Sequence, residues 1–345
     1  MLKVGVIGCG KISQVRHLPE YAANPEVKIA ALFDLNAERA QTLALQYGAK
    51  TYAAYGELLN DPEIDAVSIC TSNDSHADIT CAALAAGKHV LCEKPMATTL
   101  KDCERMVEAA RAYGKILMID QNQRLAGAHV KARELIRAGA IGKPLTFRTS
   151  FRHAGPETWS IEPGAGTWFF DRKRAVMGAM ADLGIHKTDL IQYLLGQTVV
   201  ETRATLTTLD KRLADGSLIG VDDNAICIYT MSDGAVGTMA ASWTDYGAED
   251  NSTVIYGTRG VLRIYDDREH TLILEPKGGK AEFFDVDEIQ TNENQTRSGV
   301  IDLFVQAVND PAVEGISGAS VLPAMRAVFA SIESSDTGKA VRTDR

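Results

Sequence analysis

The sequence KVGVIGCGKIS, residues 3–13, begins with a short β-branched run and continues through a glycine-rich turn. A strand, a glycine turn and the start of a helix, in this order, are typical of the first unit of a nucleotide-binding sheet. Gly8 and Gly10 would let backbone N–H groups approach a pyrophosphate at the positive end of the helix, beside Lys11 and Ile12. Ser13 stands where a third glycine is usual, so the motif is incomplete and needs support from its surroundings.

The surroundings supply that support. Up to about residue 120 the strand-like runs KVGVIG, VKIAALFD, IDAVSICTS, KHVLCEKP and KILMIDQ alternate with helical stretches at residues 12–23, 37–47, 76–86 and 100–113. Strands separated by helices of this length predict a parallel sheet wound on both faces. The glycine turn at its first strand therefore predicts a dinucleotide site.

After Gly142 the pattern changes to long segments of alternating polarity. Residues 232–234 and 258–260 have the composition of hairpin turns, and two helices are expected at about 299–308 and 320–335. We therefore expect two domains, a dinucleotide-binding domain over residues 1–122 and a substrate-binding and oligomerisation domain over residues 123–345.

The composition argues against several kinds of partner. Lys and Arg number 36 against 45 Asp and Glu, a formal net charge of −9, so neither nucleic acid nor an anionic membrane is an expected partner. The sequence shows no secretory leader and no apolar run of about 18 residues, and we expect a cytoplasmic protein. Its six cysteines lack the spacing of a zinc site, which favours buried free thiols and no bound metal.

Asp34 ends the second strand-like run and is the candidate for selecting the cofactor. A carboxylate there would accept hydrogen bonds from the adenosine ribose hydroxyls and repel a 2′-phosphate, which favours NAD over NADP. Arg39 is the first arginine after it, and we expect it to lie too far along the helix to reach such a phosphate. The alternative is that Asp34 is only the N-cap of that helix.

Two more segments, Thr71-Ser72-Asn73 and Glu93-Lys94-Pro95, stand at the ends of predicted strands. Open parallel sheets bind ligands outside the carboxyl ends of their strands, so both segments are expected near the cofactor. On position alone Lys94 fits an ordinary solvated lysine equally well. Pro95 allows the peptide bond before it to be cis.

Asp182 and His186 lie four residues apart in a predicted helix that ends at Gly196. This spacing places both side chains on one face. A carboxylate beside an imidazole raises the proton affinity of the ring and can make it a general acid or base. The alternative is an ordinary Asp–His pair on a helix surface.

With these motifs the chain resembles the Gfo/Idh/MocA family, which takes its name from glucose–fructose oxidoreductase, inositol dehydrogenase and rhizopine catabolism. The resemblance rests on EKP after the fourth strand and D-x-G-x-H about 90 residues later, and it extends over GVIGCGKIS, TSNDSHADITCAALAAGKHVLCEKPMA, TWFFDRKRAVMGAMADLGIHKTDL and SSDTGKAV. It implies an α/β protein, in which a Rossmann domain with a doubly wound parallel sheet precedes an α/β domain with a large open, mostly antiparallel sheet. In the family that sheet usually serves assembly, which implies a homodimer or homotetramer.

The resemblance also implies roles for individual residues. Lys94, Asp182 and His186 would be catalytic, and the cofactor would be faced by Gly8, Gly10, Asp34, Asn73, His76 and Glu93, to which the turn and the strand ends add Lys11, Ile12 and Thr71. When a secondary alcohol is oxidised, we expect His186 to take the hydroxyl proton and Lys94 to stabilise charge on that oxygen. Asp182 would orient the substrate or the imidazole.

Residues 152–174 are expected to line the substrate pocket, because aromatic faces pack on sugar C–H surfaces and guanidinium groups donate to hydroxyls. Trp168 and His153 are the foremost candidates, followed by Arg152, Trp159 and Arg172. The alternative is that the tryptophans are packing residues and the charges are solvated. Many family members have three consecutive glycines where this chain has Val176-Met177-Gly178, which predicts a bulkier pocket floor.

The sequence thus favours an NAD-dependent oxidoreductase that transfers a hydride between a secondary alcohol of a sugar or cyclitol and nicotinamide. The alternatives are a catalytically silent, dinucleotide-binding regulatory protein and an NADP-dependent keto-sugar reductase. Lys94, Asp182 and His186 are all present, and a silent relative would not need them.

Overall fold

The computed structural model describes residues 1–287 and 297–344, which form two compact units. Among the described residues, the first unit comprises 1–122, 159–161 and 297–322, and the second comprises 123–158, 162–287 and 323–344. A late segment of the chain therefore belongs to the first unit. The division into functional domains at residues 122 and 123 stays a prediction.

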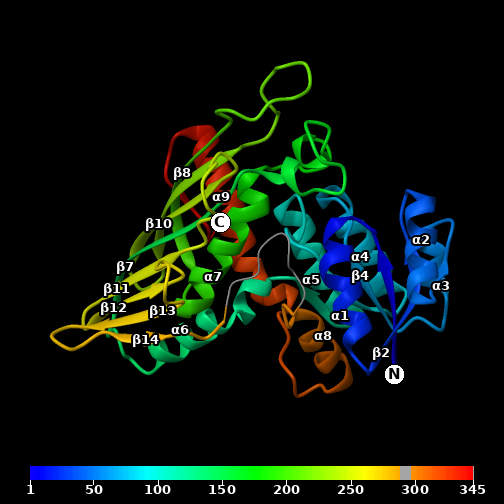
Figure 1. The fold of residues 1–345 in the computed structure, drawn as a ribbon, viewed down its shortest axis with the longest axis horizontal. Coiled ribbons are helices and arrows are strands. Elements are labelled where there is room, and N and C mark those ends of the chain that lie inside the picture. Colours follow the sequence, from blue (N-terminus) through cyan, green and yellow to red (C-terminus); the bar gives the residue numbers. More distant parts are fainter. Residues whose placement is uncertain (288–296, 345) are drawn as a thin grey trace. The chain divides into compact units, whose positions relative to one another are not determined.

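The first unit contains a six-stranded parallel sheet, in which β2 and β4 are labelled in Figure 1. Its strand order is β3-β2-β1-β4-β5-β6. This order reverses between β1 and β4, where doubly wound sheets bind their ligands. Interior positions such as Val4, Val6, Val67 and Val90 are fully buried, which explains why the runs are apolar without alternation. The strands are β1 (Leu2–Ile7), β2 (Val27–Phe33), β3 (Lys50–Thr51), β4 (Ala66–Ile69), β5 (His89–Cys92) and β6 (Leu117–Ile119). The predicted Rossmann sheet is confirmed.

Two helices of this unit match their predicted ranges because their ends carry strong local signals. Helices α2 (Ala37–Tyr47) and α5 (Leu100–Tyr113) begin after side-chain caps, Asn36 and Thr99, and end at glycines in the left-handed conformation. The first predicted helix instead starts as a π-helical turn. The helical segments are η1 (Ser13–His17), α1 (Leu18–Ala23), α3 (Tyr55–Asn60), η2 (Asn73–Ser75), α4 (His76–Ala85) and α8 (Val300–Asn309).

The second unit contains a nine-stranded sheet with the order β14-β13-β12-β11-β7-β10-β9-β8-β15. Only the pair β7 and β10 is parallel among the described strands of this sheet, so the predicted mostly antiparallel sheet is confirmed. The strands are β7 (Pro144–Arg152), β8 (Val199–Thr207), β9 (Asn224–Met231), β10 (Val236–Ser242), β11 (Thr253–Gly257), β12 (Gly260–Ile264), β13 (Leu272–Pro276), β14 (Glu282–Phe284) and β15 (Val341–Arg342).

The two faces of this sheet differ. Helices cover one face (Figure 1), with Ser331 of α9 contacting Thr202 of β8. On the other face Ile226, Ile228 and Val236 are 57%, 47% and 41% exposed. The helical segments are η3 (Asn122–Leu125), α6 (Gly127–Arg137), η4 (Pro156–Thr158), η5 (Trp168–Phe170), η6 (Met180–Gly184), α7 (Ile185–Leu195) and α9 (Gly318–Thr337), of which η3 and α9 also contain residues of the first unit. Among the described helices, none has the length and apolar character needed to cross a membrane.

Candidate active site

The predicted site residues divide between the two units. In the first unit, Gly8 follows β1 with φ +94°, and a Cβ on it would lie 2.6 Å from the carbonyl carbon and oxygen of Cys70. The ends of β1 and β4 therefore approach so closely that only glycine fits. A Cβ on Gly10 would meet no atom within 4 Å. Lys11 and Ile12 follow, both half-buried, so the turn has the open space that a pyrophosphate requires.

Asp34 ties the glycine turn to the end of β2. Its Oδ2 accepts a hydrogen bond of 2.7 Å from the Cys9 N–H, and its Oδ1 accepts one of 2.7 Å from the Asn36 N–H. Asn36, not Asp34, is the N-cap of α2, so the helix-cap alternative for Asp34 is wrong. Arg39 lies closer than expected, with its Nη1 3.6 Å from Oδ1 of Asp34.

His76 connects the two loops that follow β4 and β5. Its Nδ1 lies 2.8 Å from the carbonyl oxygen of Pro95, and its Nε2 lies 3.1 Å from that of Thr71. Burial lowers the pKa of the ring, against the opposing effect of the two carbonyls. Thr71 is half-buried and Asn73 is buried at the start of η2. Thr71 and Asn73 follow the carboxyl end of β4, where the sequence predicted them, and His76 begins α4.

Glu93 is buried and Lys94 is half-buried, and the peptide bond between Lys94 and Pro95 is cis, which the proline allows. Oε2 of Glu93 accepts a hydrogen bond of 3.1 Å from the Lys94 N–H. Oε1 lies 3.0 Å from Nε2 of His17 and 3.6 Å from Nη1 of Arg16. Protein groups therefore hold both oxygens of this carboxylate.

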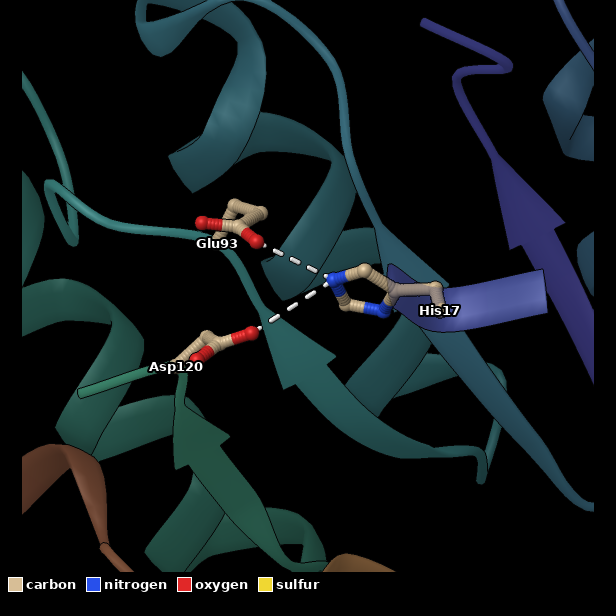
Figure 2. Close-up of side chains that lie close together, drawn as sticks. All are labelled: His17, Glu93 and Asp120. Carbon is tan, nitrogen blue, oxygen red and sulfur yellow. Dashed lines mark hydrogen bonds and ion pairs between the residues drawn. The ribbon is translucent and has the colours of Figure 1, made fainter. Parts of the chain in front are cut away.

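A buried charged cluster around Glu93 was missed by the sequence analysis. His17 Nε2 lies between Glu93 and Asp120, 3.5 Å from Oδ2 of the latter (Figure 2), and Arg16 donates to the same Oδ2 at 2.9 Å. Burial raises the pKa of Asp120 to about 6. Burial acts the same way on Glu93, but the hydrogen bond from His17 and the charge of Arg16 together lower the pKa of its carboxyl.

The ligand atoms of His17, Glu93 and Asp120 lie within 4.8 Å of one another, a spacing that a metal ion could use. Arg16 instead supplies the positive charge to both carboxylates. Two sequence signals were available for this cluster. Arg16 and His17 are consecutive ionisable residues in the first predicted helix, and Asp120 directly follows a strand at the carboxyl edge of the sheet.

In the second unit, Asp182 lies in the π-helical turn η6 and His186 in the first turn of α7, which ends at Gly196 as predicted. Each is only 6% exposed, so the alternative of a surface pair is wrong. Trp243 Nε1 donates a hydrogen bond of 3.0 Å to Oδ2 of Asp182, and Nε2 of His153 lies 3.9 Å from the same oxygen. The Phe151 ring lies 6.0 Å from the His186 ring.

The chain before this pair bends sharply. The Asp222 carboxylate accepts hydrogen bonds of 2.8 Å from the N–H groups of Gly178 and Met180, and a Cβ on Gly178 would lie 1.8 Å from the Asp222 carbonyl oxygen. Glycine is therefore required at 178. Val176 has φ +66°, a conformation in which a β-branched residue is strained.

Of the predicted pocket residues in this unit, His153 is buried, Arg152 and Trp168 are half-buried, and Arg172 is exposed. Trp168 stacks on Phe169 at 4.0 Å between ring centroids, and Phe169 meets the Trp243 ring edge-on at 6.4 Å. Trp168, Phe169 and Trp243 thus form a row of ring contacts, and the last of them donates the hydrogen bond to Asp182. The remaining candidate, Trp159, belongs to the first unit.

Lys187 is a second feature of the site region that the sequence did not predict. It follows His186 in α7, is fully buried, and donates from Nζ to the Asn251 carbonyl oxygen at 2.8 Å. Burial lowers its pKa to about 7. Burial also raises the pKa of Glu249, a residue coupled to Lys187 by charge, to about 7.

Comparison with known proteins identifies the family of this chain. The model of an oxidoreductase family with an NAD-binding Rossmann fold matches residues 2–121, and that of the GFO/IDH/MocA C-terminal domain matches residues 129–263. The chain is 29% identical over 280 residues to myo-inositol 2-dehydrogenase of Thermotoga maritima, covering 81% of this chain and 79% of the relative. It is 30% identical over 288 residues to levoglucosan dehydrogenase of Pseudarthrobacter phenanthrenivorans, covering 76% and 73%.

A solved structure of levoglucosan dehydrogenase in complex with NADH and L-sorbose matches with a TM-score of 0.86 and 26% identity. The match covers 99% of each chain. The likeness therefore extends over both units.

Proposed function

The chain belongs to the Gfo/Idh/MocA family of oxidoreductases, and from that membership we propose that it transfers a hydride between a secondary alcohol of a sugar or cyclitol and the nicotinamide of NAD. The observation that carries this proposal is the burial of Asp182 and His186 within one helical segment, with Trp243 bonded to the carboxylate. Buried ionisable groups cluster at functional sites, so a buried carboxylate and a buried imidazole one helical turn apart support this assignment.

In this proposal His186 is the general base that takes the hydroxyl proton during oxidation and returns it during reduction. Lys94 donates to the same oxygen and stabilises the charge that develops on it. Asp182, fixed by Trp243, orients the substrate or the imidazole. The dinucleotide, when bound, accepts or supplies the hydride.

The glycine turn fits a dinucleotide. We assign the pyrophosphate to the turn formed by Gly8, Gly10, Lys11 and Ile12, where Gly10 leaves open space. Asp34 is the proposed partner of the ribose hydroxyls and the reason for preferring NAD. Thr71 and Asn73 are proposed contacts of the dinucleotide, and His76 and Glu93 are further candidates in the segments that follow β4 and β5.

For the substrate we propose a sugar or a polyol. Two relatives are named for myo-inositol and levoglucosan, both of which are compact cyclic compounds with several hydroxyls. Arg152, His153 and Trp168 are the proposed contacts, together with Lys94, Asp182 and His186. His153 supports this choice most directly, because it lies beside the Asp182 carboxylate.

We propose further that the protein is a homodimer or homotetramer, assembled through the open face of the nine-stranded sheet. Ile226, Ile228 and Val236 are exposed on adjacent strands of that face, and exposed apolar side chains grouped on one sheet face favour its use in an assembly. Light scattering at micromolar concentration checks this, and a monomer would contradict it.

The function is tested by assaying inositols, aldoses and keto-sugars for formation or loss of NADH absorbance, with NAD and NADP in parallel. We expect turnover of at least one polyol or sugar and a fall in kcat of about 10²-fold or more in His186→Ala, with NAD affinity nearly unchanged. His270→Ala is the matched control, because His270 is a partly exposed histidine beside Asp285. Tight NAD binding without turnover of any compound would favour the silent, regulatory alternative.

A further inference from the structure

We propose that Glu93 and His76 form a clamp on the Lys94–Pro95 segment, and that this clamp positions the active-site lysine. The inference rests on the proposed function, in which Lys94 acts at the reacting oxygen. Glu93 holds the N–H of Lys94 at 3.1 Å, and His76 holds the carbonyl of Pro95 at 2.8 Å. The two contacts lie on either side of the Lys94 carbonyl, so the backbone that carries the lysine side chain is fixed from both directions.

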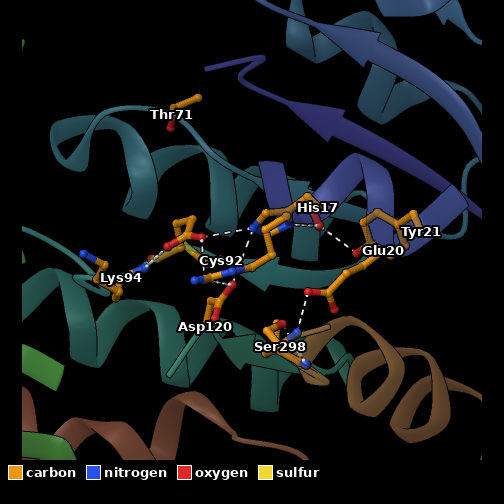
Figure 3. Close-up of polar contacts among 12 residues, drawn as sticks. His17, Glu20, Tyr21, Thr71, Cys92, Lys94, Asp120 and Ser298 are labelled. Atoms are coloured by element: carbon orange, nitrogen blue, oxygen red, sulfur yellow. Dashed lines mark hydrogen bonds and ion pairs between the residues drawn. The ribbon is translucent and has the colours of Figure 1, made fainter. Parts of the chain in front are cut away.

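The Glu93 half of the clamp is anchored by the buried charged cluster. Oε1 faces Arg16 and His17 on η1, while Asp120 after β6 holds the same two residues from the other side. Figure 3 shows Lys94 at one end of this network and His17 and Tyr21 at the other. His17 Nδ1 lies 3.2 Å from the Ser68 hydroxyl, which in turn lies 2.7 Å from that of Tyr21.

Burial makes this anchor rigid. The side chains of Arg16, His17, Glu93 and Asp120 are at most 6% exposed. Rotating the Glu93 carboxylate would leave a buried charge without its partners, which is strongly unfavourable. Oε2 is therefore held in one place, and with it the N–H of Lys94.

The clamp contacts are made within the protein. Both oxygens of Glu93 contact protein groups. We assign the single proton of the neutral His76 ring to Nδ1, which makes the shorter contact, so that this nitrogen donates to the Pro95 carbonyl. Reaction rates are very sensitive to the position of a catalytic group, and a displacement of about 1 Å can cost about 10²-fold. A group that fixes the lysine backbone therefore affects kcat more than dinucleotide affinity.

The test compares Glu93→Ala, Glu93→Gln, His76→Ala and the control Lys88→Met. Lys88 is also buried in the first unit, but its Nζ bonds the carbonyls of Asp61 and Ile64, away from this segment. We expect the two alanine variants to lower kcat by about 10–100-fold, with KM for the sugar and the dissociation constant of NADH changed by less than about threefold. Glu93→Gln keeps an oxygen that can accept the Lys94 N–H but turns an amide NH2 group toward Arg16 and His17, so we expect its kcat to lie between those of Glu93→Ala and the wild type.

A second readout is independent of turnover. Amide hydrogen exchange at Lys94 should accelerate in Glu93→Ala and stay slow in Lys88→Met. His76 lies outside the charged cluster, so His76→Ala tests the clamp even if Glu93→Ala does not fold. If the wild-type protein turns over no sugar, the proposed function fails, while exchange at Lys94 and NADH affinity still decide the clamp.

Three results would overturn the clamp. One is a tenfold or greater loss of NADH affinity with kcat retained, which would place these residues at the cofactor. Another is an equal loss of kcat in Lys88→Met, which would make the effect one of general stability. The third is unchanged exchange at Lys94 in Glu93→Ala.

Discussion

Trp243 donates a hydrogen bond of 3.0 Å from its indole nitrogen to Oδ2 of Asp182 in the interior of the second unit. The tryptophan follows β10 and is fully buried, whereas Asp182 belongs to η6, about 60 residues earlier in the chain. The sheet and the helix that follows the sharp bend at Gly178 are thus joined at the carboxylate of the candidate site.

We expect Trp243→Phe to reduce kcat/KM by about tenfold or more. Phenylalanine keeps most of the packing but leaves one oxygen of a buried carboxylate without its donor, and a hydrogen bond to a charged group contributes about 1.5–3 kcal/mol. Steady-state kinetics on the best sugar measures the effect. Tyr229→Phe is the matched control, because it removes a buried hydroxyl that contacts Thr188 on α7. A similar loss of kcat/KM in both variants would show that the hydrogen bond from Trp243 to Asp182 has no specific role in catalysis.

Val176 provides a prediction about stability. Its φ of +66° places a β-branched side chain in the left-handed region, which costs about 1–2 kcal/mol, and the same strain would apply to alanine. At most positions glycine is less stable than alanine by about 0.5–1 kcal/mol. Here we expect the reverse, with Val176→Gly more stable than Val176→Ala by about 1 kcal/mol in urea denaturation. Greater stability of the alanine variant would show that the strain is absent in solution.

The fold was predictable where local signals and long-range pairing agree. Helices α2 and α5 have caps and terminal glycines, and β7 is a single alternating run, so their bounds follow from the sequence. The strand β3 and helix α3 are two and six residues long, too short for a periodic signal. Helix α6 was not among the predicted elements, although it is amphipathic and 11 residues long.

The candidate site was predictable only where a motif marks it. Asp182 and His186 share a helical spacing, and Lys94 follows a strand, so each could be found from the sequence. Trp243 could not, because its contact with Asp182 joins residues 61 positions apart. The link between Arg16 and Asp120 spans 104 positions, and it exists only because β1 and β6 belong to one sheet. Contacts set by topology have no local signature.

Lys187 predicts a pH dependence of stability. Its pKa is about 7 in the folded protein against an ordinary 10.5, because burial disfavours the charged form. Between these values the unfolded chain binds more protons than the folded one, so this residue makes stability rise as pH increases from 7 toward 10.5. The slope approaches about 1.4 kcal/mol per pH unit at most.

We therefore expect the stability difference between wild type and Lys187→Met to change by about 2 kcal/mol in favour of wild type between pH 7 and pH 9. Urea denaturation at several pH values measures it. The exposed residue Lys101 gives the control Lys101→Met, which should run parallel to wild type. A constant difference between wild type and Lys187→Met would mean that Lys187 keeps its ordinary pKa.

Asp34 and Arg39 together predict how the cofactor preference can be changed. Asp34→Ser removes a charged acceptor from the ribose hydroxyls, a loss of about 1.5–3 kcal/mol, so NAD affinity should fall about tenfold or more. The same change removes the charge that repels a 2′-phosphate and removes the carboxylate partner of Arg39, whose Nη1 lies 3.6 Å from Oδ1 of Asp34. NADP affinity should therefore rise in this variant, because an arginine is a good partner for a phosphate.

The double variant Asp34→Ser/Arg39→Gln separates the two contributions. We expect it to keep the loss for NAD and to lose the gain for NADP, as measured by the quenching of protein fluorescence on titration with each dinucleotide. Asp34→Asn controls for the glycine turn, because its side-chain oxygen can still accept from the Cys9 N–H that Asp34 holds at 2.7 Å. If the unmodified protein prefers NADP, or if Asp34→Ser binds both dinucleotides as before, then Asp34 serves only to hold the glycine turn. The preference for NAD would then have to come from residues other than this carboxylate.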